Sequence, residues 1–479
     1  MWRLPRALAA ICLCIPFSSE ADPRVAKLNA LVDRYAALRE ASGVILVAER
    51  GHVLLRRGLG SSNRELSVET RPTHRFLIGS MTKAFTAALV MRQVARGRIA
   101  LDSPAVRYWP EFSDPSHGRI TIRHLLTHES GLKHWGAVSG FLDGPARLTQ
   151  RPADVVALYA AQGLSFPPGT REEYSSIGYM ALGVILEKVT GEQFSSLLER
   201  EIFTPVGMSS TSLDDGVSIV PGRARPYRYN FVRAAYENAE YRDASTTWST
   251  GGIVTTADDL LRWSDALSND TLLPDSLRSL IFGRNEGEAW YGWRIDTTSF
   301  GGRAAWHVGL ETGFKSQITR VPERGQTVIV LGNVRDLDTD GITRRLFAVL
   351  QNKSVDVPKP SAAKAVYRAA AAGGGDSAAA VVRAIARHPS SYDTTHSQML
   401  VAAIELRSDK ACDRAAAIYD AWLAVYPGRQ NRAVALIGAA DCRIQLGQIE
   451  AARSRIDELE RLDPGNASLP DLKRRISTP

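Results

Sequence analysis

Strand-like segments lie at both ends of residues 22–355, and helix-like segments fill the middle. Apolar runs with the composition of strands occur at 43–49, 53–58, 304–308, 314–321 and 326–333. The connections between neighbouring runs are short, which favours antiparallel pairing. One sheet built from these runs must bring the two ends of the region side by side. We therefore expect an α/β (α+β) domain over 22–355, with an antiparallel sheet and a helical cluster.

Hydrophobic periodicity predicts the helices of this region. They are expected over 24–41, 80–96, 153–162, 176–190 and 257–267. Thr256 and Asp259 have the spacing of a capping box and mark the start of the last helix. The stretch 222–244 is polar and rich in arginine, and we interpret it as a loop that covers the functional site.

The composition changes after the strand-forming region. Residues 355–360 form a stiff, proline-containing linker, and the chain beyond it is rich in alanine and helical by pattern. Prolines at three helix ends recur 38 and 37 residues apart: Pro389, Pro427 and Pro464. Residues 433–466 resemble a tetratricopeptide repeat, so 356–479 is expected to be an all-α, TPR-like domain. Two interpretations stay open: a module that binds a protein partner, or helices that brace the larger domain.

The N-terminal 21 residues have the three-part layout of a secretory signal peptide. Two arginines come first, an apolar stretch over 7–17 follows, and Ser19 and Ala21 supply small residues before the cleavage point. Crossing a bilayer takes about 20 helical residues, so this stretch is too short for a stable membrane span. We expect cleavage after residue 21 and a secreted or periplasmic protein, with an uncleaved anchor as the alternative.

The cysteines and the charge distribution limit the classes of partner. Cleavage would leave Cys412 and Cys442, which are a candidate disulfide in an oxidising compartment. The chain has no Cys-x-x-Cys, which argues against a structural zinc site. The net charge of +8 is spread along the chain without a basic run. Since nucleic-acid binding requires a clustered basic face, we expect no nucleic-acid partner.

The segment 76–85 holds the most informative pair of polar residues. An apolar run ends at Gly79, Ser80 opens the expected helix, and Lys83 lies one turn later on the same face. A serine hydroxyl is a weak nucleophile and needs a neighbouring group to take its proton. The helix N-terminus also favours negative charge on a reacting oxygen. The alternative is Ser80 as a helix cap beside a solvated lysine.

Tyr174 is the second candidate. It follows a Pro-Pro-Gly turn and precedes the helix expected from Ser176, a position that can present a phenol to a functional site. A tyrosine serves as a base only where a nearby cation stabilises its phenolate. The alternative is an aromatic side chain that only packs.

His307 and Gly309 form the third candidate, at the end of an expected strand. His307 would point toward one face of the sheet, and Gly309 would let a substrate backbone approach closely. The alternative is a surface histidine beside a turn.

Together the three segments resemble the serine β-lactamase and penicillin-binding-protein superfamily. The resemblance is to the branch that holds class C β-lactamases, D-alanyl-D-alanine carboxypeptidases and EstB-type esterases. It covers about 25–350 and extends to flanking sequences at 125–132, 168–170 and 249–252. Three motifs in the right order are far more specific than any one of them alone.

The resemblance implies a role for each candidate. Ser80 would be the acylated nucleophile, Lys83 its proton acceptor, and Tyr174 a second base that later protonates the leaving group. The backbone N–H groups of Ser80 and Leu310 would form the oxyanion hole. His307 would take the place of the lysine in a Lys-Thr-Gly motif. The resemblance implies neither a metal nor a cofactor.

The chain departs from the β-lactamase pattern at two motifs. Ser176 replaces the asparagine of Tyr-x-Asn, so a hydroxyl stands where an amide would bind the substrate. His307-Val308-Gly309 replaces Lys-Thr-Gly. Val308 has no side-chain donor, and an unperturbed histidine is mostly neutral near pH 7. The first change makes a two-ended hydrogen bond to a substrate amide and to Lys83 harder, and the second weakens the binding of a substrate carboxylate.

We therefore expect an exported serine hydrolase that forms an acyl-enzyme at Ser80. Its substrate would be a small-molecule ester, a peptide or a cell-wall-derived compound, and its turnover of β-lactams would be poor. The enzymatic alternatives are a D-alanyl-D-alanine carboxypeptidase or endopeptidase and a β-lactamase. The non-enzymatic alternative is a catalytically silent binding or scaffold homologue.

Overall fold

The computed structural model describes residues 22–112, 117–230, 233–283, 291–393, 396–426, 428 and 431–477. The expected signal peptide lies outside these residues. Within them, no helix has the length and the apolar character that crossing a membrane requires.

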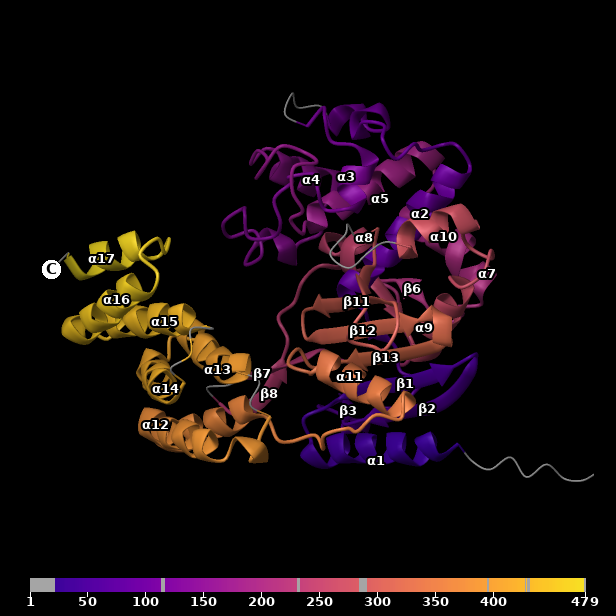
Figure 1. Cartoon of the computed structure of the whole chain (residues 1–479). Coiled ribbons are helices and arrows are strands. Elements are labelled where there is room, and N and C mark those ends of the chain that lie inside the picture. Colours follow the sequence, from indigo (N-terminus) through magenta and orange to yellow (C-terminus); the bar gives the residue numbers. More distant parts are fainter. Residues whose placement is uncertain are drawn as a thin grey trace, which may run out of the picture.

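A six-stranded antiparallel sheet joins the two ends of the expected α/β region. Its strands, in spatial order, are β10 (Arg294–Asp296), β11 (Ala304–Glu311), β12 (Phe314–Val321), β13 (Gln326–Gly332), β1 (Gly43–Glu49) and β2 (His52–Leu59). β1 lies beside β13, with Gly43 opposite Gly332. The expectation of one sheet built from distant parts of the chain is confirmed (Figure 1).

Helices cover both faces of this sheet, so the neighbouring inner strands β13 and β1 are buried along nearly their whole length. One face packs against α1 (Pro23–Leu38) and α11 (Thr339–Leu350). The other face packs against a helical cluster formed by the chain between β2 and β10 (Figure 1). The helices of this segment are α2 (Thr82–Ala95), α3 (Ile122–Leu126), α4 (Pro152–Ala160), α5 (Ser176–Thr190), α6 (Phe194–Leu198), α7 (Thr204–Val206), α8 (Trp248–Gly251), α9 (Ala257–Ala266) and α10 (Asp275–Phe282).

The expected helices are present, with small shifts at their ends. α2 begins at Thr82 rather than at Ser80, because a 3₁₀ turn over Gly79–Met81 precedes it. The side chain of Thr256 caps α9, as the sequence spacing predicts. β11 continues to Glu311, past the end expected for that strand.

Three smaller sheets were not predicted from the sequence. They pair β3 (Ser61–Asn63) with β4 (Val68–Glu69), β9 (Ile253–Thr255) with both β5 (Phe76–Leu77) and β6 (Ser212–Leu213), and β7 (Tyr227–Asn230) with β8 (Ala235–Asn238). β5 ends just before Ser80, so its sheet fixes the entry to α2.

The β7–β8 hairpin occupies the stretch that was expected to cover the functional site. Tyr227 is 2% exposed and belongs to the core beneath α1 and α11. Tyr229 is 8% exposed and belongs to the core of the C-terminal helices. The β7–β8 hairpin therefore does not cover the site, because Tyr227 and Tyr229 bury their rings in these two cores. Only the end of the stretch approaches the site, where Arg242 pairs with Glu311 at 3.1 Å.

The chain after α11 is helical and has a core of its own. Its helices are α12 (Ala362–Arg387), α13 (His396–Ser408), α14 (Cys412–Val425), α15 (Arg432–Gln445), α16 (Ile449–Leu462) and α17 (Leu469–Ser477). In Figure 1 they extend sideways from the sheet, in orange to yellow. The all-helical character agrees with the sequence analysis, and the relation to tetratricopeptide repeats stays a prediction.

The structure holds Cys412 and Cys442 as buried free thiols rather than as the candidate disulfide. The Cys412 thiol donates a hydrogen bond to Gln445 Oε1 at 3.4 Å. Burial raises the pKa of the Cys442 thiol, and the neighbouring Cys412 adds to this shift. A thiol that stays protonated is a poor nucleophile for disulfide formation, which is consistent with the free state.

Glu201 ties α2 to the segment that follows α6. Its carboxylate is 1% exposed and accepts hydrogen bonds from Arg92 at 2.7 Å and from Arg96 at 2.6 Å. Arg200 forms a further ion pair with it at 2.7 Å. Burial alone would raise the pKa of Glu201, but the hydrogen bonds from Arg96 and Arg92 outweigh burial and lower it to about 2.

We predict that Glu201→Gln destabilises the fold in a pH-dependent way. The folded-state pKa lies below the unfolded value of about 4.3, so the carboxylate stabilises the fold above that pH and loses its effect as pH falls toward 2. At pH 7 the variant should lose about 3 kcal/mol of unfolding free energy. Its difference from the parent should shrink below pH 4 in denaturant titrations. Glu199→Gln, in the same segment but exposed, is the control, and equal losses in both variants would contradict the prediction.

Candidate active site

Ser80 lies in the 3₁₀ turn between β5 and α2. Gly79 before it has a φ of +55°, in the left-handed region that glycine favours. A Cβ atom at Gly79 would come within 2.9 Å of the backbone of Leu310. The missing side chain therefore lets the Ser80 turn lie directly against β11.

Two side chains converge on the hydroxyl of Ser80. Lys83 Nζ donates to Ser80 Oγ at 3.1 Å, and Tyr174 Oη donates to it at 2.8 Å. Lys83 Nζ also donates to the carbonyl oxygen of Thr250 at 2.8 Å and lies 5.2 Å from the centre of the Tyr174 ring. Lys83 is 1% exposed, so these contacts hold its ammonium in the interior. The structure thus brings together the three residues for which the sequence predicted catalytic roles.

Two histidines hold Tyr174, and their part in the site was missed in the sequence analysis. The ring centres of His128 and His134 lie 4.5 Å and 5.2 Å from that of Tyr174. His128 Nδ1 accepts the N–H of Ser175 at 3.2 Å, and His134 Nδ1 accepts the N–H of Ser176 at 3.1 Å. Both rings therefore fix the backbone directly after Tyr174. The sequence signal that could mark them is the pair itself, two histidines six residues apart.

The histidines around the site are neutral at pH 7. Burial lowers the pKa of His134 to about 4 and that of His307 to about 3, and the Lys83 ammonium acts in the same direction on both. Burial and then Lys83 hold the pKa of His128 well below its usual range. A neutral ring can accept a backbone N–H, whereas a protonated ring cannot. Lys83 is thus the cation that these rings surround.

His307 lies on β11 and is 3% exposed, with Nδ1 at 2.7 Å from the carbonyl oxygen of Val308. It is therefore not the surface histidine that the sequence left as an alternative. Its neutral state removes the charge that a lysine would bring to this position.

Gly309 has a different role from the one expected. A Cβ atom there would lie 1.7 Å from the carbonyl oxygen of Ile78 and 2.5 Å from Ser316 Oγ. The expectation that Gly309 leaves room for a substrate backbone was wrong, because the protein's own backbone at Ile78 fills that space. Ser316 Oγ donates to the same carbonyl at 2.8 Å and secures this contact.

The other two predicted substrate-binding residues lie on β11 and at the start of α5. The side chain of Leu310 is 46% exposed, and its backbone contacts Gly79 through the close approach described above. Ser176 is 3% exposed in the first turn of α5, and its N–H is bound to His134.

A further charged pair, Glu311 and Arg242, lies beside the contact between Gly79 and Leu310 and was not predicted from the sequence. Glu311, the last residue of β11, pairs with Arg242 at 3.1 Å, and its side chain is 9% exposed. A Cβ atom at Gly251 would lie 3.3 Å from Glu311 Oε2 and 3.7 Å from the carbonyl carbon of Gly79. The Glu311 carboxylate is therefore close to the Ser80 turn. No sequence pattern marks either partner.

The described groups of the site include a hydroxyl, an amine and a phenol in contact. In the described part of the chain, no cluster of three or more histidine, cysteine, aspartate or glutamate side chains is placed to hold a metal ion. A hydroxyl with two proton-carrying partners, and backbone amides close by, are the parts that a serine nucleophile requires.

Named proteins with sequence similarity include an esterase and a peptidase. Esterase EstB of Burkholderia gladioli is 37% identical over 230 residues, which are 44% of this chain and 56% of EstB. The chain thus spans little more than half of that relative. Penicillin-binding protein 4* of Bacillus subtilis is 27% identical over 70% of this chain and 78% of its own length. D-aminopeptidase of Gluconobacter oxydans is 28% identical over 65% of this chain and 59% of its own length.

The fold is shared with solved structures as well. A penicillin-binding protein homologue from Pyrococcus abyssi superimposes with a TM-score of 0.60 over 69% of this chain and 78% of its own, at 24% identity. The model of the Beta-lactamase family matches residues 28–353, the region that contains the sheet, the helical cluster and Ser80. The chain therefore belongs to the Beta-lactamase family.

Proposed function

We propose that the protein is a serine hydrolase that forms an acyl-enzyme at Ser80 and cleaves esters or peptide and amide bonds. The observation that carries the proposal is the convergence of Lys83 Nζ and Tyr174 Oη on Ser80 Oγ, at 3.1 Å and 2.8 Å. The esterase and the D-aminopeptidase among the relatives support the two substrate classes. No cofactor is needed for this chemistry.

The first step is attack of Ser80 Oγ on the substrate carbonyl carbon. Both hydrogen bonds to Oγ are donated by its partners, so one partner must release its proton before it can take that of Ser80. Lys83 is proposed as that acceptor. The negative charge on the carbonyl oxygen would be stabilised by the N–H groups of Ser80 and Leu310.

The remaining steps conserve the proton taken from the serine. The bond from the carbonyl carbon to the leaving group breaks, Tyr174 gives a proton to the departing alcohol or amine, and Lys83 returns the serine proton to Tyr174. Water then attacks the acyl-enzyme ester, its proton passes to the same pair of side chains, and Ser80 leaves protonated with release of the acid. Holding Tyr174 with two neutral histidines keeps its oxygen within reach of Oγ throughout.

The groups on β11 favour esters and uncharged amides over substrates that carry a carboxylate. His307 has a pKa of about 3 and is therefore uncharged under ordinary conditions. Val308 offers no side-chain donor. A cell-wall D-alanyl-D-alanine carboxypeptidase or endopeptidase, or a β-lactamase, is the alternative, and penicillin-binding protein 4* is the relative that favours it. A silent scaffold homologue is disfavoured by the intact serine contacts.

The proposal also covers the location of the protein and the role of its C-terminal helices. The three-part N-terminal segment supports export, to the periplasm or the medium. The region 356–479 is proposed as a TPR-like domain that binds a protein partner or braces the hydrolase domain, because its helices form a core separate from that of the sheet.

The nucleophile is tested directly by labelling. A fluorophosphonate probe should add its mass to the peptide that contains Ser80, and Ser80→Ala should remove both the adduct and about 10⁴-fold or more of p-nitrophenyl ester hydrolysis. Ser196→Ala, at an exposed serine, should change neither. A folded protein without an adduct would instead support the scaffold alternative.

Tyr174→Phe should lower kcat by about 10²-fold to 10⁴-fold, because it removes one proton-transfer group while keeping the ring that packs on His128 and His134. Steady-state kinetics with a p-nitrophenyl ester give the measurement. Tyr241→Phe, at a 65% exposed tyrosine, is the matched control. Unchanged kcat in Tyr174→Phe would remove the tyrosine from the mechanism.

Substrate charge should separate the two enzymatic candidates. A chromogenic cephalosporin should be turned over with a kcat/KM well below about 10⁶ M⁻¹s⁻¹, and the activity toward a neutral ester should show no inflection from His307 between pH 5 and 8. Histidine protonation would occur only near pH 3, so the neutral form is present above that pH. Cephalosporin turnover at or above this limit would favour the β-lactamase alternative.

A further inference from the structure

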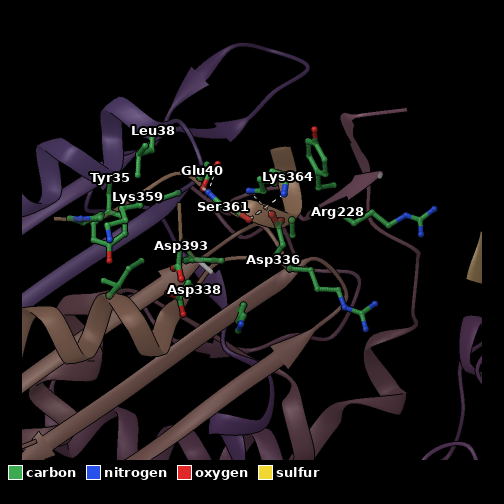
Figure 2. Close-up of a pocket in the computed structure, with 18 of the residues that line it drawn as sticks. Tyr35, Leu38, Glu40, Arg228, Asp336, Asp338, Lys359, Ser361, Lys364 and Asp393 are labelled. Atoms are coloured by element: carbon green, nitrogen blue, oxygen red, sulfur yellow. Dashed lines mark hydrogen bonds and ion pairs between the residues drawn. The ribbon is translucent and has the colours of Figure 1, made fainter. Parts of the chain in front are cut away.

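A second cavity lies where the C-terminal helices meet the sheet. It encloses about 330 Å³, within the size range of small-molecule sites, and Figure 2 shows it. Its walls come from the end of α1, from β7, from β12, from the segment joining β13 to α11, and from α12 and α13. Ser80, Lys83 and Tyr174 do not line it, so it is separate from the candidate active site.

The lining of this junction cavity carries charges of both signs in equal number. The cations are Arg228, Lys315, Arg335, Arg345, Lys359 and Lys364. The carboxylates are Glu40, Asp336, Asp338, Asp393, Glu405 and Asp409. A small-molecule site is normally mostly apolar with a few polar groups. Arg335 and Asp409 are exposed to solvent, and the less exposed charges must pair with one another or remain available to a ligand.

Some of these charges pair and hold the start of α12 in place. Lys364 Nζ lies 2.6 Å from Asp336 Oδ2, and Glu40 accepts the N–H of Ser361 at 3.1 Å. Figure 2 shows these four residues together, joined by dashed lines. Burial raises the pKa of Glu40, and the nearby Lys364 opposes that shift. This group has a structural role and needs no ligand.

Lys315, by contrast, does not belong to these paired residues. It lies on β12 and is largely buried, and within the described ranges its ammonium has neither an ion pair nor a hydrogen bond. Burial lowers its pKa, while Asp338 and Asp336 act in the opposite direction from a distance. Holding a cation partly out of water without a partner costs some stability. Such a residue is expected where a bound group supplies the missing partner.

The opposite wall offers the complementary charge. Glu405, on α13, is partly buried, and among the described residues its carboxylate forms no ion pair and accepts no hydrogen bond. Lys315 and Glu405 do not pair with each other, so more than 4 Å separates their charged atoms. One wall thus presents a free ammonium and the other a free carboxylate, with the cavity between them.

We propose that the junction cavity binds a zwitterion, namely a free amino acid or a short peptide. Its carboxylate would pair with Lys315 and its ammonium with Glu405. The apolar side chains of Leu38 and Ile342, which also line the cavity, would contact its hydrocarbon part. This inference does not depend on the proposed hydrolase activity.

A simple anion and a simple cation fit the cavity less well than a zwitterion does. A plain anion at Lys315 would meet the field of Asp336 and Asp338 without an ammonium to offset it. A plain cation at Glu405 would leave Lys315 buried and unpaired. A zwitterion satisfies both walls at once, and because the walls belong to different parts of the chain, it would also link the helices to the sheet.

Binding is tested in the Ser80→Ala background, which keeps every probe intact. The probes are L-leucine, D-leucine and L-alanyl-L-leucine, compared with leucine amide, which lacks the carboxylate, and N-acetyl-leucine, which lacks the ammonium. At least one zwitterion should bind in calorimetry and raise the unfolding temperature. Each analogue that lacks a charge should bind about 10-fold more weakly or worse, the loss expected for one charged contact.

Two variants locate the site. Lys315→Met should weaken binding of the zwitterion about 10-fold or more while leaving the weak binding of leucine amide unchanged. It should not lower the unfolding temperature without ligand, because it removes an unpaired buried charge. Glu405→Gln should have the converse selectivity, sparing N-acetyl-leucine. Lys353→Met, at an exposed lysine, is the control. No binding of any zwitterion, or equal binding in both cavity variants and the control, would overturn the proposal.

Discussion

The buried ammonium of Lys83 is the charge around which the candidate active site is organised. It is 1% exposed and is bound by the hydroxyl of Ser80 and the carbonyl oxygen of Thr250. Three histidines face this cation, and its field, together with burial, keeps them neutral. Because neutral rings accept backbone N–H groups, two of them can fix the segment that carries Tyr174. The position of the phenol thus depends on rings that burial first, and the Lys83 charge second, keep neutral.

The same site depends on two backbone contacts that only glycine allows. Gly79 and Gly309 have no Cβ, so the Ser80 turn lies against β11, with the Ile78 carbonyl in the space that a side chain at Gly309 would occupy. This contact joins the helical cluster to the sheet at the point where an oxyanion would form. The Beta-lactamase family relationship covers both sides of it, since the family model spans 28–353.

The C-terminal helices are joined to the sheet by charge as well as by apolar packing. The tyrosines of the β7–β8 hairpin enter the cores on both sides, and the Lys364–Asp336 pair closes one edge of the junction. Lys315, on the strand next to Leu310, is left unpaired there, with Leu310 directly opposite it in the ladder. The strand pair that contributes to the candidate active site therefore also forms a wall of the second cavity.

Local sequence determined much of this protein. Apolar periodicity located the strands of the main sheet and most long helices, and motif spacing marked Ser80, Lys83, Tyr174 and His307, because these patterns depend on residues within a few turns of one another. Tertiary structure alone decided the roles of His128 and His134, the use of Gly309 to admit Ile78, and the place of the β7–β8 hairpin. Among the residues that the structure describes, it also left the Lys315 ammonium without an ion pair or hydrogen bond. Each of these depends on segments distant in the sequence, and burial and charge at such contacts are set only when the chain has folded.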